Sequence, residues 1–100
     1  MSSYRVEYGK LASTQIHALL QYLAEQASTK IASQYVDGLI AFCDSLDRLP
    51  HRFKCRDDIR PGLHLANYES HVVAYRVDDK AMRVDVLAIY HRRQNYEVYF

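Results

Sequence analysis

The sequence lacks the features that would place the chain in a membrane, in an oxidising compartment or among disordered proteins. No stretch approaches the ~20 consecutive apolar residues that a membrane span needs, and residues 1–10 hold no apolar signal-peptide core. The two cysteines, Cys43 and Cys55, form no CxxC pair and demand no disulfide. Hydrophobic residues make up 49% of the chain, with three Gly and two Pro, which excludes a disordered composition. We expect one folded domain over residues 1–100, in the cytoplasm.

Motifs for bound cofactors and common catalytic centres are also missing. There is no Gly-rich phosphate loop and no GxSxG nucleophile motif. His51 and Cys55 have no further ligands at zinc-site spacing. Neither predicted helix has the basic face of a helix-turn-helix DNA reader. The sequence therefore predicts no cofactor and no metal site.

Charge is nearly balanced over the whole chain, at a formal +1, but it is unevenly distributed. Residues 51–100 carry nine Lys or Arg against seven Asp or Glu, and they hold four of the five His. Arg outnumbers Lys nine to four, and the planar guanidinium suits phosphate and carboxylate groups. The C-terminal half therefore favours an anionic partner.

The N-terminal half predicts one strand followed by two helices. Apolar and charged residues alternate over Tyr4–Tyr8, as in a half-buried strand. Apolar residues then recur every three or four positions, which predicts a helix over about 10–26 and a second one from the N-cap residues Ser28 and Thr29 to Pro50. Cys43 falls on an apolar face, as a buried thiol would. Gly38 interrupts the second helix at a cost of ~1 kcal/mol, which predicts a close packing contact.

The C-terminal half predicts three strands joined by short turns, after an irregular connector over 51–61. The strands are expected at Leu63–Tyr68, His71–Val77 and Met82–Tyr90. In the last one, strict alternation would place Val84, Val86, Ala88 and Tyr90 on one face. The element order is β-α-α-β-β-β. We therefore expect an α+β fold, with the αα-hairpin packed on one face of a mainly antiparallel sheet.

Three local segments, together with this element order, resemble the ParE/RelE superfamily of bacterial toxins from type II toxin–antitoxin modules. They are Arg60-Pro61-Gly62-Leu63, Tyr75-Arg76-Val77-Asp78 and His91-Arg92-Arg93-Gln94. The resemblance covers essentially the whole chain, and the first and last segments look more like the ParE branch. ParE toxins stall replication by inhibiting DNA gyrase and catalyse no reaction of their own, whereas RelE toxins cleave mRNA on the ribosome. Whether the chain is an enzyme therefore depends on its branch.

The ParE-like alternative implies a binding surface at the exit of the last strand. Its target-binding residues would be His91, Arg92, Arg93, Tyr96 and Tyr99. Arg and Tyr are the side chains that protein interfaces favour as anchors. A histidine at a strand end is as often a hydrogen-bonded structural residue, and the aromatic tail could instead pack on the core.

The RelE-like alternative requires groups that help a ribose 2′-OH attack the adjacent phosphate. Its candidate catalytic residues are His91, Arg92, Arg93, Tyr96, His64 and Arg60. The chain departs from that branch in the segment Leu63–Asn67, which contains one His and no Lys or Arg.

The resemblance also implies a partner. A ParD-like antitoxin would neutralise the toxin in a hetero-oligomer, its C-terminal helix lying on the apolar stripe of the second helix. The candidate antitoxin-binding residues are Tyr35, Val36, Ile40 and Cys43.

Overall fold

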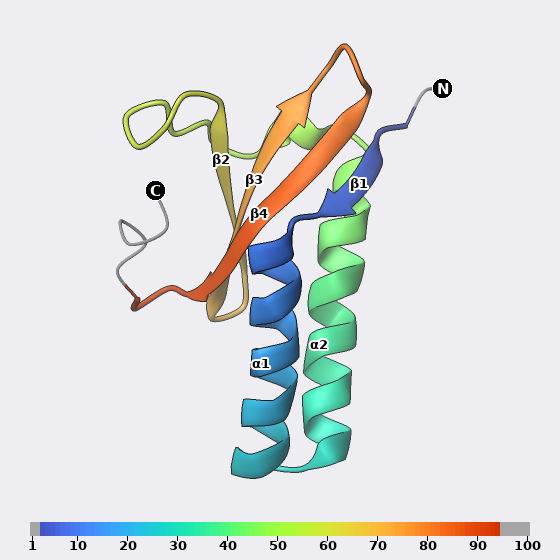
Figure 1. The fold of residues 1–100 in the computed structure, drawn as a ribbon, viewed down its shortest axis with the longest axis vertical. Coiled ribbons are helices and arrows are strands. Elements are labelled where there is room, and N and C mark those ends of the chain that lie inside the picture. The colour runs from blue at the N-terminus through green and yellow to red at the C-terminus, as the bar shows by residue number, and fades with distance from the viewer. Residues whose placement is uncertain (1–2, 95–100) are drawn as a thin grey trace.

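The fold consists of a helical hairpin packed against a twisted four-stranded sheet (Figure 1). A computed structural model describes residues 3–94. Its elements are β1 (Arg5–Tyr8), α1 (Lys10–Gln26), α2 (Thr29–Asp44), two short 3-10 turns (Ser45–Asp47 and Pro50–Arg52), β2 (Leu63–Tyr68), β3 (His71–Asp78) and β4 (Arg83–His91). The predicted element order and the α+β class are confirmed.

The strands lie in the order β1-β4-β3-β2. The neighbours β2, β3 and β4 pair antiparallel, because short turns of two and four residues join them, while β1 pairs parallel to the first half of β4. The crossover from β1 to β4 is long enough to contain both helices. The sheet is therefore mainly antiparallel, as expected, with β4 in a central position.

Both helices cover one face of the sheet and extend beyond its lower end (Figure 1). Ala12 of α1 and Leu39 of α2 are fully buried against Val73, Tyr75 and Val86 of the sheet. The Ser28 hydroxyl caps α2 by accepting a hydrogen bond from the amide of Ile31 at 3.1 Å. The opposite face of the sheet has a smaller apolar cluster, formed by Leu63, Val72, Ala74, Ala88 and Tyr90.

Helix α2 is shorter than the sequence pattern predicted. It ends at Asp44, and the chain tightens into a 3-10 turn at Ser45, whose hydroxyl donates a hydrogen bond back to the carbonyl of Phe42. Leu49, which falls within the predicted helix, is exposed and has a left-handed backbone (φ 48°). The following Pro50 cannot continue a helix, so the chain has to leave the helical path before it.

The alternation of β4 is interrupted at Leu87. Ala74 pairs with Ala88, but the next residue of β3, Tyr75, pairs with Val86, so Leu87 is an extra residue in a β-bulge. Val84 and Val86 consequently face the helices, whereas Ala88 and Tyr90 face the opposite side. The prediction that all four share one face is wrong, because a bulge reverses the alternation beyond it.

No helix within residues 3–94 is both long enough and apolar enough to cross a membrane.

Candidate functional site

The end of β4 presents two exposed arginines on a turn whose backbone amides are all hydrogen-bonded. All four consecutive amides of this turn donate. The amide of His91 donates to Gln94 Oε1 at 2.8 Å, and that of Arg92 to the carbonyl of Ser70 at 2.9 Å. The amide of Arg93 donates to His91 Nδ1 at 3.1 Å, and that of Gln94 to the His91 carbonyl at 2.8 Å. We call residues 91–94 the exit turn.

The side chains of Arg92 and Arg93 are exposed. Within residues 3–94, neither guanidinium is paired with a carboxylate, although five ion pairs form elsewhere in that range. The structure therefore brings three of the predicted site residues, His91, Arg92 and Arg93, together at one corner of the sheet. Tyr96 and Tyr99 lie outside the described residues.

A polar cluster on the helix side supports the exit turn. The rings of His71 and His91, opposite each other in β3 and β4, meet edge to face at 5.4 Å between centroids. The Tyr35 hydroxyl of α2 lies 2.7 Å from His71 Nδ1. Burial lowers the pKa of His71, because it disfavours the charged imidazolium, and the proximity of His91 lowers it further. Tyr35 was predicted to bind a partner, but its hydroxyl forms a hydrogen bond within the protein, to His71.

The bulge at Leu87 directs Arg92 to the open face of the sheet. There it lines a hollow of about 330 Å³ together with Lys54 and Arg56. The remaining lining residues are Leu65, Asn67, Val72 and Tyr90. Arg56 also makes a bidentate pair with Asp58, with two N–O distances of 2.9 Å. The hollow thus gathers three cationic side chains over an apolar floor, a setting suited to an anionic group.

Lys54 and Arg56 were not among the predicted site residues. The connector that carries them pairs with β2 through a bridge between Cys55 and His64, flanked by a hydrogen bond from the Arg56 amide to the Leu63 carbonyl at 2.6 Å. Residues on either side of a bridged position point to the same face of a sheet. The alternation of Lys54 and Arg56 around Cys55 is therefore the one sequence signal that could have identified them.

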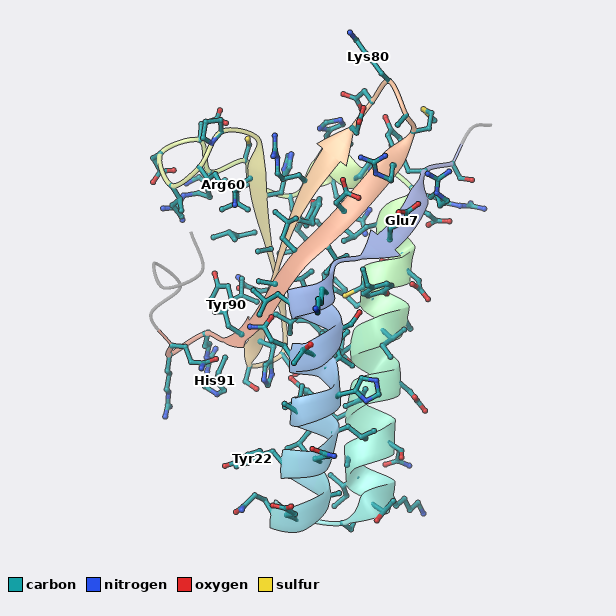
Figure 2. All side chains as sticks on the ribbon, in the orientation of Figure 1. Glu7, Tyr22, Arg60, Lys80, Tyr90 and His91 are labelled. Atoms are coloured by element: carbon teal, nitrogen blue, oxygen red, sulfur yellow. The ribbon has the colours of Figure 1, made fainter. Side chains whose placement is uncertain are left out.

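His64 and Arg60 do not join the exit turn. His64 is only 6% exposed, its Nδ1 donates to the Phe53 carbonyl at 3.0 Å, and its ring stacks on Tyr75. It lies opposite Tyr75, whereas His91 lies opposite His71, four residues along β3 and so ~13 Å away. Arg60 lies in the connector, towards the other end of the sheet from His91 (Figure 2). The two histidines among the candidate catalytic residues, His64 and His91, are therefore not adjacent.

Two of the four predicted antitoxin-binding residues are inaccessible. Val36 is 4% exposed, and Cys43, which belongs to the core between the helices and the sheet, is 0% exposed. Burial also raises the pKa of the Cys43 thiol to about 12, in line with its predicted role as a structural thiol. Ile40 is half-buried beside Tyr8 of β1 in a small hollow of about 160 Å³. The apolar stripe on α2 thus lies mostly in the core.

Another hollow with a mainly apolar lining lies between α1 and the end of β4 and measures about 620 Å³. Tyr22 projects from α1 on the side where Tyr90 and His91 end the strand (Figure 2), and its side chain is 58% exposed. The hollow is lined by Gln15, Ala18, Leu19, Tyr22, Leu23, Ser70, His71, Ile89, Tyr90, His91 and Gln94. We call it the α1–β4 groove. The exit turn forms one end of it.

Comparison with known structures and families agrees with this architecture. The chain resembles a structure of the chromosomal ParDE system of P. aeruginosa, with a TM-score of 0.77 and 14% identity over 89% of this chain and 96% of the other. It also resembles the toxin–antitoxin complex RelBE2 of Mycobacterium tuberculosis, with a TM-score of 0.69 and 23% identity over 94% and 97% of the two chains. At such identities, the likeness shows the fold.

No curated protein matches the chain by sequence. The family model described as the ParE toxin of type II toxin–antitoxin system, parDE, matches residues 6–96, which is nearly the whole chain. The chain therefore belongs to the ParE toxin family of type II toxin–antitoxin systems.

Proposed function

We propose that the protein is a toxin that inhibits DNA gyrase and so blocks replication, with Arg92 and Arg93 as its main contacts to the target. Gyrase is the target that the resemblance to the ParE branch implies. The observation that carries the proposal is the exit turn, where two exposed arginines stand on four hydrogen-bonded amides. Arginine held in this way can anchor an interface, because little backbone freedom is lost on binding.

Inhibition by binding fits the side chains better than catalysis does. Cleavage of RNA needs a base and an acid within reach of the same phosphate. His64 is buried and engaged with a backbone carbonyl, and it lies ~13 Å along the sheet from His91. A binding toxin needs neither group.

A ribosome-dependent mRNA interferase is the second candidate, and one observation favours it. Lys54, Arg56 and Arg92 line one hollow on the open face of the sheet. Lys54 and Arg92, beside the Arg56–Asp58 pair, could stabilise the charge that develops on a transferring phosphate in the transition state. This candidate would work through the hollow rather than through His64.

The partner we propose is a ParD-like antitoxin, bound as a hetero-oligomer with the α1–β4 groove as its docking surface. The groove is apolar at Leu19, Tyr22 and Leu23 and polar where it meets His71 and Gln94. An amphipathic segment fits such a surface, with its apolar side in the groove and its polar side towards the exit turn. The exposure of Tyr22 supports this choice over the buried Val36 and Cys43.

Two assays run side by side test the target. Purified protein is added to DNA gyrase with relaxed plasmid, and separately to programmed ribosomes carrying a defined mRNA. We expect loss of supercoiling in the first assay and an intact mRNA in the second. Site-specific mRNA cuts together with unimpaired supercoiling would replace our proposal by the interferase.

A further inference from the structure

His91 was expected to touch the target, but its backbone amide, its carbonyl and its ring Nδ1 all form hydrogen bonds within the exit turn. Its backbone amide and carbonyl both bond to Gln94, to the side-chain Oε1 and to the amide, each at 2.8 Å. Its ring nitrogen Nδ1 accepts from the amide of Arg93 at 3.1 Å. One residue thus supplies a donor and two acceptors to a turn of four.

From this geometry we infer that His91 is a positioning residue, which fixes the direction of Arg92 and Arg93 through its Nδ1 acceptor and does not itself bind the target. The inference rests on the proposed function only in naming what the two arginines bind. The hydrogen bonds that hold the exit turn are present in the protein without a target.

The Nδ1 contact is the side-chain bond that locks Arg93. Without an acceptor at this point, the Arg93 amide would turn to water, and the residue would sample other backbone conformations. A mobile backbone at Arg93 would increase the conformational entropy that is lost when its side chain is immobilised at an interface. The amide of Arg92 keeps its own partner, the Ser70 carbonyl, so loss of the His91 ring should loosen Arg93 more than Arg92.

The position of the His91 ring is itself supported from the next strand. The His71 ring meets it edge to face at 5.4 Å, and Tyr35 holds His71 from α2. Since the Nδ1 atom accepts a hydrogen bond, it carries no proton in this arrangement.

Asparagine provides a matched test, because its side-chain oxygen can take the place of Nδ1 as an acceptor. We would prepare H91N and H91A and confirm by thermal unfolding that both are folded. The first readout is amide hydrogen exchange at Arg92 and Arg93. We expect H91A to exchange roughly fivefold faster at Arg93, which is what loss of one net hydrogen bond allows. We expect H91N to remain near the native rate.

The second readout is the concentration that half-inhibits gyrase supercoiling. H91A should require several times more protein than the native chain, and H91N should restore most of the inhibition. If H91N is as defective as H91A in gyrase inhibition, or if H91A leaves exchange at Arg93 unchanged, the positioning role is wrong.

The two readouts separate the inference from the proposed target. If the native protein does not inhibit gyrase but the exchange pattern is as expected, the positioning of the turn stands and gyrase is discarded. If native inhibition is strong and H91A inhibits equally well, gyrase stands and the positioning role is overturned.

Discussion

The Tyr68 hydroxyl of β2 fills the space beside Gly38 of α2. A Cβ atom built on Gly38 would lie 2.3 Å from this hydroxyl oxygen and 3.4 Å from the ring carbon that carries it. The Tyr68 ring also contacts Tyr35 and Phe42, at centroid distances of 5.8 and 5.4 Å, so it cannot move away freely. The close contact predicted for this glycine is confirmed.

The effect of Gly38→Ala should therefore depend on Tyr68. In the native chain the clash offsets the ~1 kcal/mol that alanine contributes to a helix, so we expect no gain in the free energy of unfolding, or a loss. In Tyr68→Phe the hydroxyl is gone, and the same substitution should stabilise by up to ~1 kcal/mol. Urea unfolding of the four proteins measures this coupling. An equal effect of Gly38→Ala in both backgrounds would contradict the contact.

Stability should decrease on mild acidification because of His71. Its pKa is lowered from the ordinary 6.5 in the folded protein, so the unfolded chain takes up the proton first. Above pH 6.5 both states are neutral at this residue and it contributes no pH dependence. As the pH falls below 6.5, the unfolded state gains protons and the free energy of unfolding decreases, until the folded protein is also protonated.

The variant His71→Gln removes this titration. Unfolding free energies of the native protein and the variant, measured from pH 7.5 to 5, should show a shallower decline for the variant. Carboxylates with lowered pKa values, such as Asp57 and Asp79, act at lower pH and should affect both proteins alike. Parallel curves over this range would show that His71 is not held in its neutral form.

The two cysteines should differ sharply towards a thiol reagent. Cys55 is exposed, whereas Cys43 is fully buried with a pKa raised to about 12. We expect one thiol to react promptly in the native protein and the second only on unfolding. Mass spectrometry after brief labelling identifies the modified residue. Prompt labelling of Cys43 would show that this face of α2 is accessible, and α2 would again be a candidate surface for the antitoxin.

The position of the antitoxin surface can be tested with two equally exposed apolar residues. Tyr22 is 58% exposed in the α1–β4 groove, and Ile31 is 53% exposed on α2, outside it. Tyr22→Glu should weaken binding of the antitoxin at least tenfold, since a buried interface aromatic is often worth 2 kcal/mol or more. Ile31→Glu is the matched control and should leave binding unchanged in calorimetry. The reverse pattern would move the surface to α2.

Local patterns in the sequence were sufficient for the elements but not for the details that shape the site. Helices and strands repeat every 3.6 or 2 residues, so their existence and order could be predicted. The early end of α2 depends on Ser45 bonding back to Phe42, a local competition that periodicity does not register. The close contact at Gly38 could be predicted, because glycine destabilises the interior of a helix and is expected there where a larger side chain would not fit.

The site itself depends on contacts between distant segments. Because of the bulge at Leu87, Arg92 faces the open side of the sheet and His91 faces the helices. The bulge could not be predicted, because the residues around Leu87 are apolar on both sides of it. Lys54 reaches the same hollow only because the connector pairs with β2. The spacing of apolar residues also does not tell how much of a helix its neighbours cover. Val36 and Cys43 were therefore expected on an accessible stripe, but both are buried.

Gyrase supercoiling by the double variant Arg92→Ala/Arg93→Ala tests the central claim most directly. The control is Lys30→Ala/Lys80→Ala, which removes the same charge from exposed positions away from the exit turn, Lys80 lying at the far end of the sheet (Figure 2). We predict that the control inhibits gyrase like the native protein, while the Arg92/Arg93 variant needs at least tenfold more protein because two anchors of ~1 kcal/mol or more are lost. Undiminished inhibition by the Arg92/Arg93 variant would contradict the account.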